Sequence, residues 1–493
     1  MRIPVPDLSD TSNLLVRRLI IGTVSFASLI GALDMSVVNI SVPVIIRDWQ
    51  IPIGLGSLII LSYLLTLTVL ILVMGKLADR YGFRNLFLSG LFVFGLGSVL
   101  CGFAPDIFFL IGSRVVQATG AAMLTAVSPA IITRYLPDTD RGKSLGYLIA
   151  CAAVGYAIGP GLGGLITSYF SWRWIFYINL PVVIFGLLLG YYVIPRDPPG
   201  QEHRPFDIPG AFLFIAAMAG ILGSFSFFQV AGTPDRVLEF LFVAGLVCGV
   251  LFFVRDRKDP DPLLFSPMIR NRNFTLGLVT CFIITALFSG VTYLMPLYLV
   301  NSRHLEPFLV GMIMMIPALF SMIAAPVSGS LADRYGSPIV SAVSIGISAV
   351  GFILIYTFNP VTAVVFIIIA MIITRVSTAS FFGPNGRLIM GHCTPETIGT
   401  GSGMMMAVRH AGLVCGIALF QSVFAIRMYL EGIPRDGTPL VPRLTPTLSV
   451  LGYEAVYVIA FVLCIVVVII SLKSKDAPAP SDSTEYGDTS PPI

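Results

Sequence analysis

Charged residues are scarce in this sequence: they make up 11% of its 493 residues, against 56% hydrophobic residues. The mean hydropathy is +0.90. Soluble domains typically carry about 25% charged residues, so the composition excludes an ordinary soluble protein and indicates a polytopic membrane protein. The net charge of +4 is small for a chain of this length. We therefore expect no nucleic-acid partner.

The residue groupings of most enzymes are also missing. The seven cysteines lie apart in apolar surroundings, and none has a Cys-x-x-Cys or metal-ligand spacing, so we interpret them as small core residues. The sequence contains no phosphate-binding loop, no metal-ligating cluster and no grouping of a nucleophile with a base. We expect no enzymatic activity, no metal or other cofactor, and no step driven by ATP.

Long apolar runs dominate the sequence. A bilayer-spanning helix needs about 20 mostly apolar residues, and dividing the chain at its polar breaks gives about fourteen such runs. The first run is too long for a signal peptide, so we expect no cleavable one. The predicted fold is an all-α polytopic membrane protein. The centres of the runs lie near Ile30, Leu65, Phe94, Met123, Gly155, Phe185, Ala217, Gly245, Ile284, Ala318, Ala349, Met371, Gly412 and Phe461.

Lysine and arginine residues are divided unevenly between the two sets of loops. One set, which includes both termini, holds about twenty of them, whereas the other set holds about seven; cytoplasmic loops carry the excess. We therefore predict that both termini are cytoplasmic. Tryptophan prefers the membrane interface, and the three tryptophans fall at the outer ends of predicted helices: Trp49, Trp172 and Trp174.

An internal repeat divides the chain. The segment GKLADRYG at 75–82 recurs as GSLADRYG at 329–336, and Pro43 has a counterpart in Pro296 at nearly the same offset. Such parallel repeats are typical of secondary transporters. We predict a cytoplasmic N-terminus (1–18), an N-terminal six-helix bundle (19–195), two inserted membrane helices (205–256), a cytoplasmic linker (257–272), a C-terminal six-helix bundle (273–472) and a disordered cytoplasmic tail (473–493).

Few charged residues fall well inside the predicted spans. Asp34 is the only acidic one, and Arg114, Arg375 and Arg409 are the basic ones. A charge at the centre of a membrane helix costs about 2.5–3.5 kcal/mol on insertion scales and usually marks a functional site. Burial favours the neutral acid and a nearby arginine favours the carboxylate. Asp34 beside Arg114 is thus a candidate proton-coupling site; the alternative is a permanent structural ion pair.

Five residues are candidates for a substrate cavity. Asn39 either binds substrate or hydrogen-bonds a neighbouring helix. Arg375 either reaches the interface, lines the cavity or selects an anionic group. His410 is either a titrating group, because histidine changes charge near neutrality, or a packing residue. The full set is Asn39, Gln117, Arg375, Arg409 and His410.

Five segments together resemble the major facilitator superfamily, specifically its fourteen-helix drug:proton antiporter family. The resemblance covers residues 19–472 and implies two six-helix bundles that alternate access to a central cavity. In the fourth-helix segment Ala118 stands where the family pattern usually has glycine. The segments are LDMSVVNISVP (33–43), GKLADRYGFRN (75–85), RVVQATGAA (114–122), GYAIGPGLGG (155–164) and SWRWIFYINLP (171–181).

The loop motif and its repeat are interpreted as a conformational latch. Asp79 is able to face the positive end of a helix in the other half, and Arg80 and Arg84 are able to pair with Asp138 or Asp140. The alternative is a solvated loop that obeys the positive-inside rule. The predicted latch residues are Gly75, Asp79, Arg80, Gly82, Arg84, Asp138, Asp333 and Arg334.

A glycine-rich segment occupies the fifth predicted helix. Its small residues recur at spacings that let two helices approach closely, and its proline adds a kink. It serves either ordinary helix packing or a hinge and seal between the two halves. The residues are Gly155, Gly159, Pro160, Gly163 and Gly164.

We expect a monomeric transporter of the cell membrane that exports lipophilic drugs or toxic compounds in exchange for protons, by alternating access. Its partners are a small lipophilic molecule, protons and the lipid bilayer, and the proton gradient supplies the energy. One alternative is a flippase or exporter of an endogenous lipid or metabolite on the same scaffold. A second is a transport-dead sensor.

Overall fold

The structure is a computed structural model that describes residues 14–136, 138–196, 208–231, 236–257, 267–359, 361–393, 398–431 and 446–476. Throughout these residues the regular secondary structure is helical, which confirms the predicted fold class. The predicted cytoplasmic N-terminus, linker and tail lie mostly outside the described residues.

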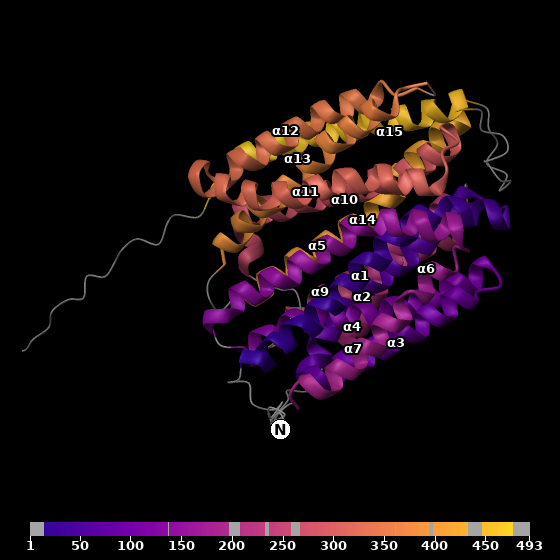
Figure 1. Ribbon diagram of the computed structural model, residues 1–493. Coiled ribbons are helices and arrows are strands. Elements are labelled where there is room, and N and C mark those ends of the chain that lie inside the picture. The colour runs from indigo at the N-terminus through magenta and orange to yellow at the C-terminus, as the bar shows by residue number, and fades with distance from the viewer. Residues whose placement is uncertain are drawn as a thin grey trace, which may run out of the picture.

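The first six predicted spans form a bundle in the lower part of Figure 1. The sixth span is broken after its first turn, at Ile178, so it comprises two helices. The helices are α1 (Leu14–Trp49), α2 (Ile53–Tyr81), α3 (Phe83–Phe103), α4 (Ile107–Tyr135), α5 (Asp138–Tyr169), α6 (Trp174–Tyr177) and α7 (Asn179–Val193).

The last six spans form a second bundle above the first (Figure 1). A short 3-10 turn, η1 (Pro267–Arg270), precedes it, and a π-helical turn, η2, extends α10. The elements are α10 (Arg272–Leu297), η2 (Tyr298–Ser302), α11 (Pro307–Tyr335), α12 (Ser337–Tyr356), α13 (Val364–Gly391), α14 (Ile398–Leu430) and α15 (Pro446–Lys473).

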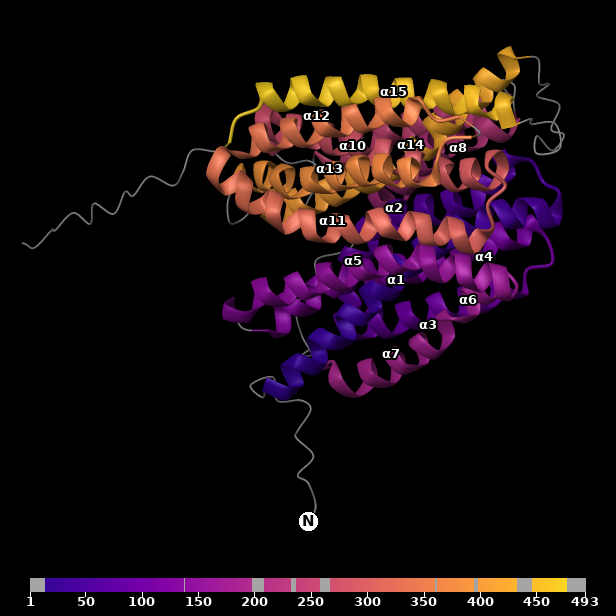
Figure 2. The same cartoon turned by 45° about the horizontal axis from the view of Figure 1, so that its top comes forward.

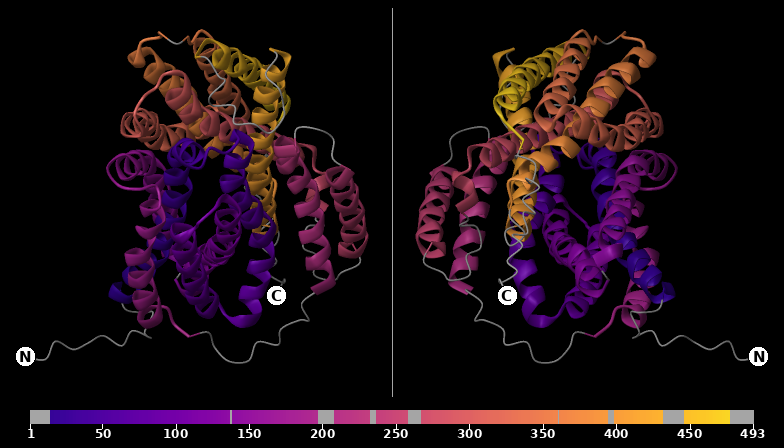
Figure 3. Two further views of the ribbon diagram at one scale, coloured as in Figure 1. Left: turned by 90° about the vertical axis from the view of Figure 1, so that its right-hand side faces the viewer. Right: turned by 90° about the vertical axis from the view of Figure 1, so that its left-hand side faces the viewer.

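The two inserted segments are also helical, as α8 (Ile208–Ala231) and α9 (Arg236–Asp256). They stand as a pair beside the two bundles (Figure 3). Among the described residues, twelve helical stretches are long and apolar enough to cross a bilayer, and these two helices are not counted with them. A polytopic membrane fold is thereby confirmed with twelve spans, and the predicted count of fourteen stays a prediction for α8 and α9.

The same helix pairs recur in both bundles. In the first bundle α1 packs along α5, and α2 and α3 pack against α4; in the second α10 packs along α14, and α11 and α12 pack against α13. The repeated loop motif also has the same backbone in both places, because Gly82 (φ 91°) and Gly336 (φ 86°) each connect two helices in a conformation that favours glycine. The sequence repeat thus corresponds to a structural repeat.

Contacts between the bundles gather at one end. There the backbone N–H of Phe308 on α11 donates to Ser168 Oγ on α5 over 2.9 Å. Arg47 at the end of α1 donates to the Val300 carbonyl oxygen over 3.1 Å. Toward their other ends α5 and α11 diverge (Figure 2). The two bundles are therefore joined at the end that holds Trp49 and Trp172, whose rings pack 5.0 Å apart.

Candidate functional site

An ion pair lies within the first bundle. The Arg114 guanidinium on α4 donates from NH1 to Asp34 Oδ2 on α1 over 2.7 Å. Both residues are only 1% exposed. Two opposite charges withdrawn from solvent interact strongly, and each makes the removal of the other costly.

Two amide side chains complete the shell of the carboxylate. Gln117, one turn along α4 from Arg114, donates to Asp34 Oδ1 over 2.9 Å, and Asn179 at the start of α7 donates to the same oxygen over 2.9 Å. Ser98 on α3 accepts from Gln117 over 2.8 Å and from Asn179 over 3.4 Å. Asp34 thus accepts hydrogen bonds from three side chains, which come from two other helices, α4 and α7.

The arginine is enclosed by aromatic rings and backbone. Its guanidinium carbon lies 4.1 Å from the centre of the Tyr63 ring on α2 and 5.8 Å from that of Phe176 on α6. Arg114 Nε also donates to the Ile59 carbonyl oxygen over 3.3 Å. These contacts stabilise the cation without water, so in this state the pair is closed to solvent.

Glycines bring α3 close enough to α4 for the cluster to form. A Cβ atom at Gly97 would lie 2.6 Å from the Gln117 Cβ, and one at Gly120 would lie 2.6 Å from the Gly90 carbonyl oxygen. Larger residues here would push the helices apart. The close approach places Ser98 within hydrogen-bonding distance of the Gln117 amide.

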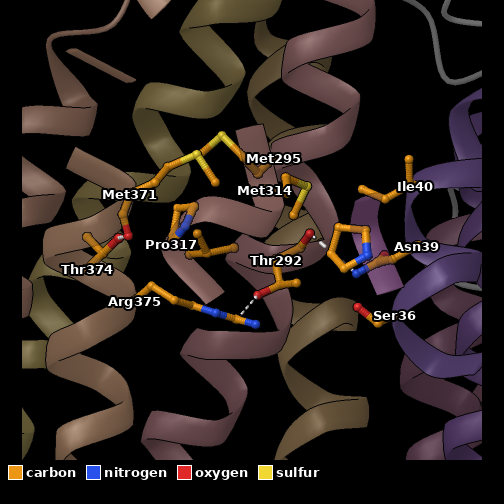
Figure 4. A pocket seen from close by; sticks show the side chains of 12 residues that line it. Ser36, Asn39, Ile40, Thr292, Met295, Met314, Pro317, Met371, Thr374 and Arg375 are labelled. Carbon is orange, nitrogen blue, oxygen red and sulfur yellow. Dashed lines mark hydrogen bonds between the residues drawn. The ribbon is translucent and has the colours of Figure 1, made fainter. Parts of the chain in front are cut away.

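A cavity lies between the two bundles (Figure 4). Five helices contribute to its wall: α1 and α5 from the first bundle, and α10, α11 and α13 from the second. Most of the lining is apolar, with three methionines. The lining residues are Ser36, Asn39, Ile40, Pro160, Val291, Thr292, Met295, Met314, Pro317, Met371, Thr374 and Arg375.

Arg375 is the one charged residue of this lining. Its NH1 donates to the Thr292 hydroxyl over 3.1 Å, as the dashed line in Figure 4 shows. The guanidinium carbon lies 4.1 Å from the centre of the Phe288 ring. In the part of the chain that the structure describes, no carboxylate pairs with it. The cavity therefore presents a positive charge.

Asn39 reaches across the cavity from α1. Its amide Nδ2 donates to the Thr292 carbonyl oxygen on α10 over 3.5 Å. Its Oδ1 is buried and lacks a hydrogen-bond partner. The same side chain thus joins the two bundles and offers the cavity an unmet acceptor.

Helix α1 separates the ion pair from the cavity. Ser36 and Asn39 follow Asp34 by two and five residues, which places them about 200° and 140° around the helix from it. The carboxylate and the cavity therefore lie on opposite sides of one helix. Any influence of one site on the other has α1 as its shortest route.

The other candidate cavity residues lie elsewhere. Gln117 belongs to the Asp34 cluster and not to the cavity lining. Arg409 and His410 are both on α14 and outside the cavity lining. The Arg409 guanidinium carbon lies 4.7 Å from the centre of the Phe382 ring on α13. Only Asn39 and Arg375 of the five candidates line the cavity.

The candidate latch residues divide between the two bundles. Arg84 donates to the Tyr191 carbonyl oxygen on α7 over 2.5 Å. Asp333 on α11 forms an exposed ion pair with Arg387 on α13, and Arg334 lies over the Tyr335 ring. The Asp79, Arg80 and Asp138 side chains lie outside the described residues. Gly75 has open space around it.

The glycine-rich segment of α5 contacts both bundles. Three of its glycines face α1: a Cβ atom at Gly155 would lie 2.5 Å from the Leu29 carbonyl oxygen, one at Gly159 would meet Ser36, and one at Gly163 would meet Val37. Gly164 instead faces α11, where a Cβ atom would lie 2.5 Å from the Pro307 carbonyl oxygen. Pro160 lies in the cavity wall.

The sequence alone did not identify four polar residues of these sites. Asn179, Ser98 and Tyr63 surround the ion pair, and Thr292 holds Arg375. Asn179 carried a usable signal, because it is a polar residue in the long apolar run that follows Trp174. Besides the buried carboxylate of Asp34, the membrane-spanning stretches contain a half-buried one, that of Glu454, near the start of the last span, Val450–Lys473.

Comparison with known sequences gives a consistent result. A profile described as "Major Facilitator Superfamily" matches residues 24–417. The riboflavin transporter RibZ of Clostridioides difficile is 30% identical over 401 residues, which cover 80% of this chain and 85% of that protein. The multidrug resistance protein Stp of Mycobacterium tuberculosis is 28% identical over 396 residues, covering 80% and 73%. The putative multidrug resistance protein MdtD of Klebsiella pneumoniae is 27% identical over 399 residues, covering 80% and 84%.

Solved structures show the same fold. A bacterial homolog of the human lysosomal transporter Spinster, in an inward-facing and unoccupied conformation, superimposes with a TM-score of 0.64 at 15% identity, covering 95% of this chain and all of that one. A D-xylose-proton symporter superimposes with a TM-score of 0.62 at 14% identity, covering 93% and 98%. At such low identity the likeness concerns the fold alone.

Proposed function

Because the chain belongs to the Major Facilitator Superfamily, we propose that this multi-span membrane transporter exports lipophilic small molecules in exchange for protons. Export proceeds by alternating access between the two bundles. The names of the relatives Stp and MdtD support the export of toxic compounds. The proton gradient is the energy source, and the protein acts as a monomer in the cell membrane.

The observation that supports proton coupling is the buried Asp34–Arg114 pair. The carboxylate accepts hydrogen bonds from Arg114, Gln117 and Asn179 in this state and is closed to water. A proton reaches Asp34 only if α1 moves relative to α4 or α7. Protonation weakens the pairing with Arg114, and this favours the state in which the cluster is open.

Substrate acts on the same helix from its other side. A molecule in the cavity contacts Ser36 and Asn39 on α1 and displaces the Asn39 hydrogen bond to Thr292. Both ligands thus act on the position of α1, the substrate from the cavity and the proton from within the bundle. This gives an exchange in which neither ligand needs to touch the other.

In this proposal the end at which the two bundles are joined, near Trp49 and Trp172, faces outward. Both termini are then cytoplasmic, and the structure is an inward-facing state whose outer end is joined by Arg47 and by the contact of Ser168 with Phe308. The glycine-rich segment of α5 forms the outer seal through Gly164. The repeated loop motif latches the inner ends in the opposite state.

We further propose that α8 and α9 cross the membrane and complete fourteen spans. With 24 and 21 residues, they are about 36 and 32 Å long, enough for a hydrocarbon core of about 30 Å. They pack closely where Gly220 meets Gly245. The outer face of α9 is apolar and exposed, as lipid contact requires; it includes Phe240, Val243, Val247 and Val250.

A second candidate is the transport of an endogenous metabolite on the same scaffold. It is favoured by the similarity to RibZ, a riboflavin transporter. The two candidates share the mechanism above and differ in the molecule that fills the cavity. Saturable binding of riboflavin to the purified protein would favour the metabolite.

Proton-driven transport is testable with the purified protein in liposomes that have an acidic interior. Protons leaving the liposome then drive substrate inward, so an antiporter accumulates substrate and a uniporter does not. Protein-free liposomes with the same gradient correct for passive trapping of weak bases. If the transport of every tested lipophile were independent of the pH gradient, proton coupling would be contradicted.

A further inference from the structure

We propose that the cavity selects amphipathic organic anions, in which an apolar body carries one carboxylate or sulfonate that binds Arg375. The proposal rests on the proposed transport function and goes beyond it by assigning the charge of the substrate. It also assigns Arg375 as the residue that determines that charge.

The first support is the balance of charge around the cavity. Its lining contains an arginine and no acidic residue. Asp34 cannot supply a negative charge there, because it is buried on the opposite side of α1 and its oxygens already accept three hydrogen bonds. A cationic molecule would therefore meet a positive charge with no carboxylate to offset it.

The second support is the incomplete bonding of Arg375. An arginine side chain has five N–H donors. Among the described residues, Arg375 donates one hydrogen bond, to the Thr292 hydroxyl. A guanidinium left without a counter-charge inside a membrane protein is costly. A bound carboxylate or sulfonate would supply that counter-charge through paired hydrogen bonds, the arrangement that arginine favours.

A second guanidinium adds to the positive potential. The Arg409 guanidinium on α14 lies over Phe382, which is about two turns along α13 from Arg375. Arg409 packs on Phe382 and has no carboxylate partner among the residues that the structure describes. Arg375 and Arg409 therefore both contribute positive potential to this region, and no acidic residue of the cavity lining offsets it.

The remaining wall fits the apolar body of such a molecule. Met295, Met314 and Met371 line one side of the cavity, above Arg375 in Figure 4, and methionine side chains adapt to ligands of differing shape. The unmet acceptor of Asn39 lies on the facing helix. A hydroxyl or amide N–H on the body would satisfy it.

Equilibrium binding without any gradient tests the selection of charge. The probes are fluorescein and rhodamine 6G, which share the xanthene ring and are measured by fluorescence polarisation on the purified full chain. Fluorescein is an anion, whereas rhodamine 6G, whose carboxylate is esterified, is a cation. We expect fluorescein to bind more tightly than rhodamine 6G. Arg375→Ala is expected to weaken fluorescein binding at least about tenfold, the loss expected for one charged hydrogen bond, and to leave rhodamine 6G binding unchanged.

Two further variants separate charge from folding. Arg375→Lys keeps the positive charge but not the paired hydrogen bonds, so it should retain fluorescein binding at a reduced affinity. Arg236→Ala removes an exposed arginine at the start of α9 and should bind like the wild type. A preference of the wild type for rhodamine 6G, or unchanged fluorescein binding in both Arg375 variants, would overturn the proposal.

The assay also separates this proposal from the proposed function. Fluorescein binding that depends on Arg375, together with transport that ignores the pH gradient, would contradict proton coupling and leave the anion site intact. Proton-driven transport of fluorescein, together with fluorescein binding that is unchanged in both Arg375 variants, would instead support proton coupling and contradict the anion site.

Discussion

Arg114 and Asp34 are 80 residues apart in the chain, and their side chains meet at 2.7 Å with neither more than 1% exposed. Breaking one partner of a buried pair leaves the other charge uncompensated, at a cost of about 3–5 kcal/mol. Replacing both partners by neutral groups of similar shape is far less destabilising. This difference separates the structural from the coupling contribution of the pair.

The first prediction concerns stability. Asp34→Asn and Arg114→Gln should each lower the thermal stability of the purified protein, and the double variant should be more stable than the sum of the two losses predicts. Proton-driven transport should stay absent in all three. Recovery of coupling in the double variant, measured in liposomes, would show that the charges serve only structure.

A second prediction concerns the outer seal. Gly164→Ala places a methyl group 2.5 Å from the Pro307 carbonyl oxygen, so it should open the outer end and slow the return to the inward-facing state. Transport should fall, and a cysteine introduced at Ser36 in the cavity should become accessible from outside. Gly146→Ala is the matched control, because it lies on the same helix with open space around it.

Equal effects of the two alanine substitutions would refute the seal. They would mean that α5 tolerates neither change because of its own helical conformation, and the contact with α11 would then have no special role.

A third prediction concerns topology. In a variant whose native cysteines are replaced, Leu440→Cys should react with a membrane-impermeant maleimide added outside intact cells, because the segment between α14 and α15 is predicted to be extracellular. The 50–54 segment should behave likewise. Labelling of position 440 from the cytoplasm alone would invert the assigned orientation.

A fourth prediction joins the proton and the anion. Exchange of one outgoing anion for one incoming proton moves two positive charges inward, each worth about 2.3 kcal/mol per 100 mV. In liposomes, a potential set with potassium and valinomycin, positive inside, should accelerate fluorescein uptake without a pH gradient. A monovalent cation exchanged for one proton would be electroneutral, so insensitivity to the potential would contradict the anionic substrate.

The sequence predicted the helices better than it predicted their contacts. All fourteen predicted centres lie within helices, because a run of apolar residues of membrane length has few alternatives to a helix. The outcome for Gln117 differs. It was predicted to line the substrate cavity, but the packing of α3 and α7 against α4 places its amide against Asp34.

Arg375 and Asn179 show the same limit. Three roles for Arg375 fitted the sequence, and its place in the cavity wall follows from how α13 and α10 are rotated against each other. Asn179 reaches Asp34 because the chain breaks at Ile178, between α6 and α7. Such rotations and breaks depend on tertiary packing, which local patterns do not encode.

The central claim is that Asp34 carries the exchanged proton, and transport by Asp34→Asn in liposomes tests it most directly. Asparagine has nearly the same shape but does not take up a proton. We predict that the variant loses accumulation driven by the pH gradient while it still exchanges labelled for unlabelled substrate across the membrane. If it accumulates substrate with the pH profile of the wild type, Asp34 is not the coupling site, and His410 becomes the next residue to test.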